Sequence, residues 1–258
     1  MVTPWVLKEL GAEVITLNDK PNGTNINEDC GTLNLNNLIN EVKKHGAHAG
    51  IAHDGDADRT LLCDEKGGIV DGDKILGLWA VEMKRARKLK GNAVAATVMS
   101  NLGLEVYLRK HGIALIRTKV GDRYVTERMV KDGLNLGGEQ SGHIVFFDYN
   151  TTGDGPITAL HMLYLIKKLS RPLSTIARRI ELYPQVLINI PVKKITPLPR
   201  AVLDAVKEAE ETLGDKGRVL VRPSGTEPLI RVMVEGEDEK LVSGLGNGIA
   251  DVIKVKMA

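Results

Sequence analysis

Residues 49–59 read AGIAHDGDADR, a short apolar segment followed by a turn with three aspartates at alternate positions. The apolar part is typical of a buried strand, and the small residues between the aspartates let the backbone curl around an ion. Asp54, Asp56 and Asp58 would repel one another without a cation, and hard ions such as Mg²⁺ take oxygen ligands of this kind. Arg59 adds a fixed positive charge suited to a phosphate. On this stretch alone, a solvated acidic turn remains the alternative.

A calcium-binding EF-hand loop also begins with alternating aspartates, and Glu65 stands at its twelfth position. The sixth position of that loop must be glycine, whereas this chain has Arg59 there. The segment before the turn also has the pattern of a strand and not of a helix. The sequence therefore argues against an EF-hand.

The composition indicates an ordinary globular protein with two or three small domains. The chain has 258 residues, 43% of them hydrophobic and 3% aromatic, with a net charge of +2. No basic block interleaves with aromatic residues, so we expect no nucleic-acid partner. Two cysteines, Cys30 and Cys63, give no disulfide framework. Because no apolar run approaches the ~20 residues of a membrane span, and no signal-peptide pattern is visible, we expect a cytoplasmic protein without membrane contact.

The N-terminal pattern alternates helix and strand. We expect a helix from Thr3 to Leu10, a strand at residues 13–17, a helix at 35–45 and the strand that leads to Asp54. This order is typical of a parallel α/β domain. No strand precedes the first helix, so we expect the natural unit to begin upstream of Met1.

Two further segments follow the acidic turn. The apolar spacing in the first predicts helices at 73–90, 104–111, 124–131 and 156–169, alternating with strands at 93–98, 113–118 and 144–147. The second predicts strands at 185–190, 218–221 and 229–235, a helix at 200–213 and a final helix from Asp238. Gly244, Gly246 and Gly248 should leave that last helix weak or frayed, since each glycine costs about 1 kcal/mol relative to alanine. We place the domains at residues 1–70, 71–183 and 184–258.

Two loops carry further polar chemistry. Residues 222–228 read RPSGTEP between two predicted strands, and their arginine, hydroxyls and glycine suit a phosphate, with Arg231 on the next strand. Residues 137–143 read GGEQSGH, a mixture of groups suited to sugar hydroxyls. Lys119, at the end of the strand predicted at 113–118, could face a substrate. The alternatives are an ordinary turn, a buried structural histidine at His143 and a solvated lysine at Lys119.

The three loops, in this order and spacing, resemble the α-D-phosphohexomutase superfamily over essentially the whole chain. Within it the chain is most similar to the bacterial phosphoglucosamine mutase branch, through residues 97–104 (TVMSNLGL) and Gln140. The resemblance implies two three-layer α/β domains of mutase type, the first incomplete, and a small α+β C-terminal domain. It also implies interconversion of glucosamine 6-phosphate and glucosamine 1-phosphate through a phosphoserine and a bisphosphate intermediate.

The resemblance assigns roles to individual residues. Asp54, Asp56 and Asp58 would hold Mg²⁺ and Arg59 would contact the phosphoserine, while Lys119 and His143 would act in acid–base or orienting roles. The substrate-binding residues implied are Glu139 and Ser141 for sugar hydroxyls, and Arg222, Ser224, Gly225, Thr226 and Arg231 for phosphate.

The chain also departs from the superfamily. No serine here has the setting of the phosphoserine, and the domain that carries it is absent, so we expect this chain alone to be inactive and to need that domain as its partner. His53 stands where relatives usually have an aromatic residue. The remaining alternatives are the phosphomannomutase/phosphoglucomutase branch and a non-catalytic module that binds sugar phosphates.

Overall fold

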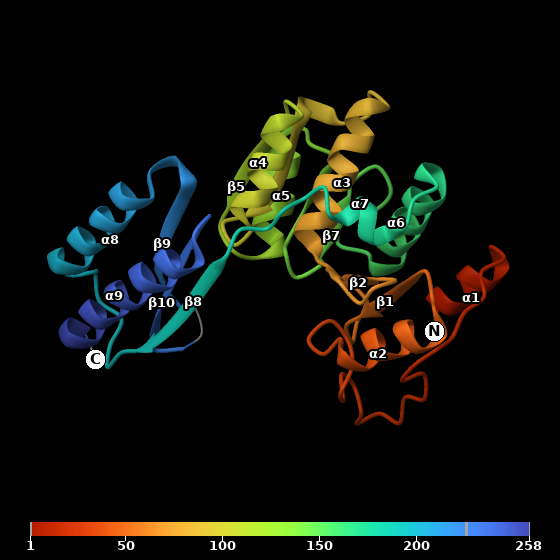
Figure 1. The fold of residues 1–258 in the computed structure, drawn as a ribbon, viewed down its shortest axis with the longest axis horizontal. Helices are drawn as coiled ribbons and strands as arrows, with labels where there is room; N and C mark the ends of the chain where they lie inside the picture. The colour runs from red at the N-terminus through yellow and green to blue at the C-terminus, as the bar shows by residue number, and fades with distance from the viewer. Residues whose placement is uncertain (1, 225–226, 258) are drawn as a thin grey trace. The chain divides into compact units, whose positions relative to one another are not determined.

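The computed structural model describes residues 2–224 and 227–257. The chain forms two compact units, which we describe separately: residues 1–100 with 104–181, and residues 101–103 with 182–258 (Figure 1). Within the described ranges, no helix has the length and apolar character needed to cross a membrane.

The first unit begins with an antiparallel sheet. Helices α1 (Val2–Glu9) and α2 (Asn36–His45) precede three strands that pair in the order β1-β2-β3: β1 (Ala49–His53), β2 (Thr60–Asp64) and β3 (Ile69–Val70). Only residues 54–59 join β1 to β2, and a parallel pair needs a crossover of about a dozen residues or more. The sequence predicted neither β2 nor β3, and the parallel pattern expected for this part of the chain does not form, because β1 pairs antiparallel with β2. The acidic turn is the tip of a hairpin.

The strand predicted at residues 13–17 does not form. A strand needs a neighbour for its ladder hydrogen bonds, and none of the described strands pairs with this segment. Ile15, in the middle of the apolar run that suggested the strand, is half exposed.

The rest of the first unit is a four-stranded sheet with helices. The strands β4 (Ala93–Thr97), β5 (Ala114–Thr118) and β6 (Leu136–Gly138) are parallel, and β7 (Ile144–Phe146) closes the order β5-β4-β6-β7 as an antiparallel edge. The helices are α3 (Gly72–Arg85), α4 (Leu102–Lys110), α5 (Asp122–Asp132), α6 (Gly155–Leu169) and α7 (Leu173–Ala177), with a 3₁₀ turn at Lys90–Asn92. The strand β6 was not predicted, because its two glycines read as a loop.

Helix α3 ends at Arg85, five residues before the predicted end at Lys90. Arg87 takes a left-handed φ of 57°. Lys88 N then donates to Met83 O over 2.8 Å and Arg87 N to Lys84 O over 2.9 Å. These two bonds satisfy the last carbonyls of the helix and turn the chain away from its axis.

The second unit is the expected α+β domain. An antiparallel sheet in the order β8-β10-β9 is formed by β8 (Gln185–Pro191), β9 (Gly217–Pro223) and β10 (Leu229–Gly236). Helices α8 (Arg200–Leu213) and α9 (Glu239–Met257) cover it (Figure 1), with a 3₁₀ turn at Gly214–Lys216. Val202, Ile249 and Ile253 of the helices share one core with Val232 and Val234 of the sheet.

Helix α9 runs without a break through its three glycines, so the predicted fraying was wrong. Gly246 explains part of this result. A Cβ added there would lie 2.7 Å from Cγ1 of Val186, so glycine lets the helix lie close to β8. Burial of the apolar face of α9 against the sheet offsets the low helix propensity of glycine.

Candidate active site

The acidic turn brings its three carboxylates together. One oxygen from each of Asp54, Asp56 and Asp58 lies within 4.8 Å of the others. Arg59 N donates to Asp54 Oδ1 over 3.1 Å, and Arg59 Nε lies 3.5 Å from Asp54 Oδ2 and 3.9 Å from Asp58 Oδ1. One guanidinium therefore faces two of the three acids and only partly neutralises them.

This set of groups fits a hard divalent cation. The donors are all carboxylate oxygens, which is the ligand type that Mg²⁺ prefers. Among the described residues, Asp58 Oδ1 is buried without a hydrogen-bond partner, and a buried carboxylate oxygen normally has one. A cation at this turn would satisfy it.

The backbone of the turn is constrained. Ala57 has a left-handed φ of 59°, which is uncommon for a residue with a Cβ. Its N–H donates to Asp54 O over 3.2 Å, and its carbonyl accepts from Gly155 N over 2.9 Å at the start of α6. The turn is thus held by a segment about a hundred residues away along the chain.

His143 connects the GGEQSGH loop to the acidic turn. Gly153 N donates to His143 Nε2 over 3.0 Å, so Nε2 carries the lone pair and Nδ1 carries the proton. Nδ1 then donates to Asp58 Oδ2 over 3.0 Å. The imidazole is 3% exposed, and both of its nitrogens are engaged within the protein.

Gly153 is a residue of this site that the sequence reasoning missed. A Cβ at this position would lie 2.5 to 2.6 Å from three atoms of the His143 ring. In the sequence, residues 153–155 read GDG directly before the helix predicted at 156–169. The glycine just before a helix-capping Asp154 was the available signal, but nothing in the sequence indicated which side chain would approach it.

Glu139 and Ser141 lie in the same loop and contact each other. Ser141 Oγ donates to Glu139 Oε2 over 3.4 Å, and Gly121 N donates to Glu139 Oε1 over 3.1 Å. The second bond brings residues 118–123 to the GGEQSGH loop. Lys119 is exposed there, with Nζ 5.8 Å from the centre of the Tyr124 ring.

Gln140 and His53 form hydrogen bonds with residues outside the acidic turn. Gln140 O accepts from Gly72 N over 3.0 Å, and its side chain bonds to Asp71, whose pKa is raised by burial. His53 Nε2 lies 3.0 Å from Thr3 Oγ1, and Nδ1 lies 2.6 Å from Thr60 Oγ1. Burial lowers the pKa of His53. His53 thus joins α1 to the β-hairpin.

The RPSGTEP loop lies in the second unit, between β9 and β10. Arg222 and Arg231 stand directly opposite each other in the sheet. Burial, and then the charge of Arg231, lowers the pKa of Arg222. Ser224 is 5% exposed, and its N–H donates to Leu229 O over 2.9 Å. Gly225 and Thr226 lie outside the described residues.

Two arginines facing each other across a β-ladder favour an anion. Like charges directly opposite one another destabilise a sheet. Arg231 Nη2 lies 3.6 Å from the exposed Glu227, but within the described ranges its buried Nε has no hydrogen-bond partner. A phosphate placed between these guanidinium groups would offset the repulsion.

Comparison with known proteins defines the class. Three models of the phosphoglucomutase/phosphomannomutase family match the chain: alpha/beta/alpha domain II at residues 1–68, alpha/beta/alpha domain III at 71–183 and the C-terminal domain at 187–252. The chain therefore belongs to the phosphoglucomutase/phosphomannomutase family, and its fold comprises mutase-type domains II, III and IV.

The curated relatives are more specific. A phosphoglucosamine mutase of Thermodesulfovibrio yellowstonii is 56% identical over 92% of this chain and 53% of its own length. Another from Syntrophotalea carbinolica is 52% identical over 98% of this chain and 56% of its own length. The chain thus spans about half the length of the relatives it matches.

Solved structures show the same fold. A phosphoglucomutase/phosphomannomutase family protein of Burkholderia thailandensis matches 98% of this chain and 57% of its own, with a TM-score of 0.79 and 22% identity. An N-acetylphosphoglucosamine mutase of Aspergillus fumigatus, solved with GlcNAc-6P and magnesium, matches 88% of this chain and 57% of its own, with a TM-score of 0.70 and 20% identity.

Proposed function

We propose that these domains belong to a mutase that interconverts glucosamine 6-phosphate and glucosamine 1-phosphate. The observation that carries the proposal is the hydrogen bond from His143 to Asp58, which joins the GGEQSGH loop to the acidic turn. Relatives about half identical to the chain are phosphoglucosamine mutases. The A. fumigatus neighbour was solved with a phosphorylated amino sugar and magnesium, which supports the same substrate class and cofactor.

Asp54, Asp56 and Asp58 would hold Mg²⁺. When bound, Mg²⁺ supplies charge neutralisation to phosphoryl transfer, which depends on positioning and electrostatics more than on covalent chemistry. Arg59 contributes a second positive charge that remains 42% exposed, so it can also reach a phosphate. Asp54 also fixes the backbone at Arg59, because its Oδ1 accepts from the Arg59 backbone N–H.

His143 has the geometry of a positioning residue. Its Nε2 accepts from Gly153 and its Nδ1–H donates to Asp58, so neither nitrogen is free to exchange a proton with a substrate. We infer that it orients Asp58 for the cation. Lys119 is exposed at the neighbouring loop, so of the two proposed acid–base residues it is the one that can approach a sugar oxygen.

Glu139 and Ser141 would bind sugar hydroxyls, since their oxygens lie in a partly open loop beside the acidic turn. Arg222, Ser224, Gly225, Thr226 and Arg231 would grip the phosphate that is not transferred. The facing arginines support this role.

The phosphoserine, the bisphosphate intermediate, the inactivity of this chain alone and its cytoplasmic location stay predictions. By the proposed mechanism, a phosphoserine of the partner domain would give its phosphoryl group to O1 of glucosamine 6-phosphate, and the resulting bisphosphate would turn and return its 6-phosphoryl group to the serine, leaving glucosamine 1-phosphate. The atoms balance, because each transfer breaks one P–O bond and forms another.

Calorimetric titration of the chain with glucosamine 6-phosphate, in the presence of Mg²⁺, tests the proposed binding. We expect saturable binding that Asp56→Asn weakens when Mg²⁺ is present and leaves unchanged without it. Asp204→Asn, an exposed carboxylate on α8, is the matched control and should bind normally. Tighter binding of mannose 6-phosphate or glucose 6-phosphate than of the amino sugar would favour the other branch of the family. No binding of any of the three would contradict the proposal.

A further inference from the structure

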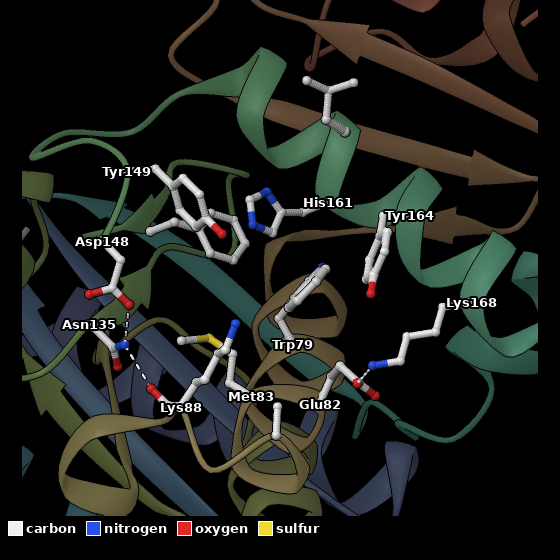
Figure 2. Close-up of a pocket in the computed structure, with 13 residues that line it drawn as sticks. Trp79, Glu82, Met83, Lys88, Asn135, Asp148, Tyr149, His161, Tyr164 and Lys168 are labelled. Atoms are coloured by element: carbon white, nitrogen blue, oxygen red, sulfur yellow. Dashed lines mark hydrogen bonds and ion pairs between the residues drawn. The ribbon is translucent and has the colours of Figure 1, made fainter. Parts of the chain in front are cut away.

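The first unit has a cavity that the residues of the acidic turn do not line. Its volume is about 380 Å³, and it is lined by side chains of α3, α6 and the segment around β7 (Figure 2). None of the residues proposed above for metal, sugar or phosphate lines it. Cavities of ~300 to 1,000 Å³ with mostly apolar walls are typical of small-molecule sites.

Aromatic rings gather in this cavity. Four of the nine Phe, Trp and Tyr residues of the chain line it: Trp79, Phe146, Tyr149 and Tyr164. His161 lies at their centre, stacked on Phe146 at 4.1 Å and edge-on to Trp79 at 4.7 Å between ring centroids. Phe146 is buried beneath His161, whereas Tyr149 and Tyr164 are 68% and 56% exposed and can offer a ring face to a planar ligand.

Two polar groups of the wall are suited to one edge of a ring. In the described part of the chain, Trp79 Nε1–H is buried without a hydrogen-bond acceptor, although the whole residue is 8% exposed. His161 Nδ1 donates to Ile157 O over 2.9 Å, so Nε2 carries a lone pair. Burial lowers the pKa of His161, which keeps the ring neutral and preserves that acceptor.

The charged groups of the cavity wall are Glu82, Asp148, Lys88 and Lys168. Glu82 is bonded to Lys168, and Asp148 is bonded to Lys90 and Asn135. Lys88 makes no direct ion pair among the described residues, although its charge adds to the bonds from Lys90 and Asn135 that lower the pKa of Asp148. Its side chain points toward Tyr149 and His161 (Figure 2). An anionic substituent on the ligand would pair with it.

We propose that this cavity binds a nucleoside monophosphate, a site separate from the phosphosugar site. The base would lie against the aromatic rings and present a carbonyl oxygen to Trp79 Nε1–H and an N–H to His161 Nε2. Its phosphate would pair with Lys88. The recognised features are a flat ring with an acceptor and a donor on one edge, and a negative charge.

The fluorescence of Trp79 can report binding in the cavity. The only other tryptophan, Trp5, is 64% exposed on α1, so Trp5→Phe leaves one indole in the chain. We expect uridine 5′-monophosphate to change the fluorescence of Trp79 in a saturable way. Ribose 5-phosphate and glucosamine 6-phosphate, which lack the ring, should not. Adenosine 5′-monophosphate shows whether the site distinguishes between bases.

Variants identify the cavity as the site. In the Trp5→Phe background, His161→Phe keeps a ring and removes the acceptor, and Lys88→Met removes the cation. Each should weaken binding about fivefold or more, the factor expected for one hydrogen bond or ion pair. Lys131→Met on α5, an exposed lysine outside the cavity, should bind as the parent does. Saturation-transfer NMR with the same ligand detects binding if the indole emission does not respond.

Three results would overturn the proposal. One is no saturable signal by either method with either nucleotide. The second is equal binding of ribose 5-phosphate, and the third is binding that both cavity variants leave unchanged. Because binding of glucosamine 6-phosphate is measured separately by calorimetry, failure here is distinguishable from failure of the phosphosugar site.

Discussion

His143 illustrates how one side chain can act through another. Its proton lies on Nδ1 and is directed at Asp58, while Nε2 accepts from Gly153 N–H. Heteronuclear NMR of the imidazole should therefore show the Nδ1–H tautomer at neutral pH. The opposite tautomer would contradict the positioning role.

Two substitutions separate the two nitrogens of His143. In His143→Asn the amide N–H₂ can stand where Nδ1 stands and still donate to Asp58, whereas in His143→Gln it reaches only the region of Nε2. We expect His143→Asn to keep most of the affinity for Mn²⁺, used as a probe for the cation, and His143→Gln to lose about tenfold. Equal losses in both would indicate a purely structural histidine.

Arg231 should show a conditional effect on stability. Without phosphate, Arg231→Met removes the repulsion with Arg222, so the free energy of unfolding should stay level or rise by up to about 1 kcal/mol. With inorganic phosphate, the parent should gain thermal stability and the variant should not. Arg200→Met, an almost fully exposed arginine on α8, is the control that should keep the phosphate response. The same phosphate response in Arg231→Met would contradict the anion site.

His161 should make the chain sensitive to acid. Burial lowers its pKa in the folded state, so unfolding takes up a proton below the pKa of a free imidazole, about 6.5. Its contribution to stability is complete above about pH 6.5 and is lost as the pH falls toward the pKa of the folded state. The charged groups that line the same cavity are Lys88, Lys168, Glu82 and Asp148. Chemical denaturation from pH 7.5 to 5 should show a smaller loss for His161→Phe than for the parent, with the exposed His48→Gln as control.

Among the helices and strands, α9 offers a matched set of glycines. At Gly244 and Gly248 an added Cβ would meet nothing within 4 Å, so alanine should stabilise the chain by about 0.5 to 1 kcal/mol at each. At Gly246 it would lie 2.7 Å from Val186, so the gain should vanish or reverse. Urea denaturation of the three variants checks this. Equal effects at all three would show that α9 does not lie close to β8.

The sequence predicted most helices and strands because their apolar spacing is regular. It failed where pairing decides the outcome. Residues 13–17 have the composition of a strand but no described strand partner. The apolar spacing of α3 continues beyond Arg87, although the left-handed conformation of that residue has already ended the helix. The short turn between β1 and β2 requires antiparallel pairing. The alternation of predicted helices and strands suggested a parallel sheet instead.

The candidate site was foreseen in its residues and not in its connections. The alternating aspartates and the polar glycine-rich loop are each a contiguous sequence motif, so Asp54, Asp58 and His143 could be named as candidates from the sequence. That His143 donates to Asp58 depends on a contact between residues 85 positions apart, and that Gly153 makes room for the ring depends on a contact between residues 10 positions apart. No local pattern contains that information.

For the chain as a whole, the domains match half of a phosphoglucosamine mutase, with the acidic turn and the GGEQSGH loop joined in one unit and the facing arginines in the other. The proposed reaction also needs a serine that carries phosphate, which the sequence reasoning placed in a partner domain. Because the chain matches only 53% of the T. yellowstonii relative, the rest of that relative can be joined to it for a direct test of the whole assignment.

That test is ³¹P NMR of glucosamine 6-phosphate with the chain fused to the N-terminal half of the T. yellowstonii relative, in Mg²⁺ and a trace of sugar bisphosphate. We predict that glucosamine 1-phosphate appears with the fusion and not with the chain alone. Changing Asp54, Asp56 and Asp58 together to asparagine should abolish the conversion, and Asp204→Asn should not affect it. Turnover that survives the triple substitution, or a folded fusion that converts mannose phosphates but not glucosamine phosphates, would contradict the assignment.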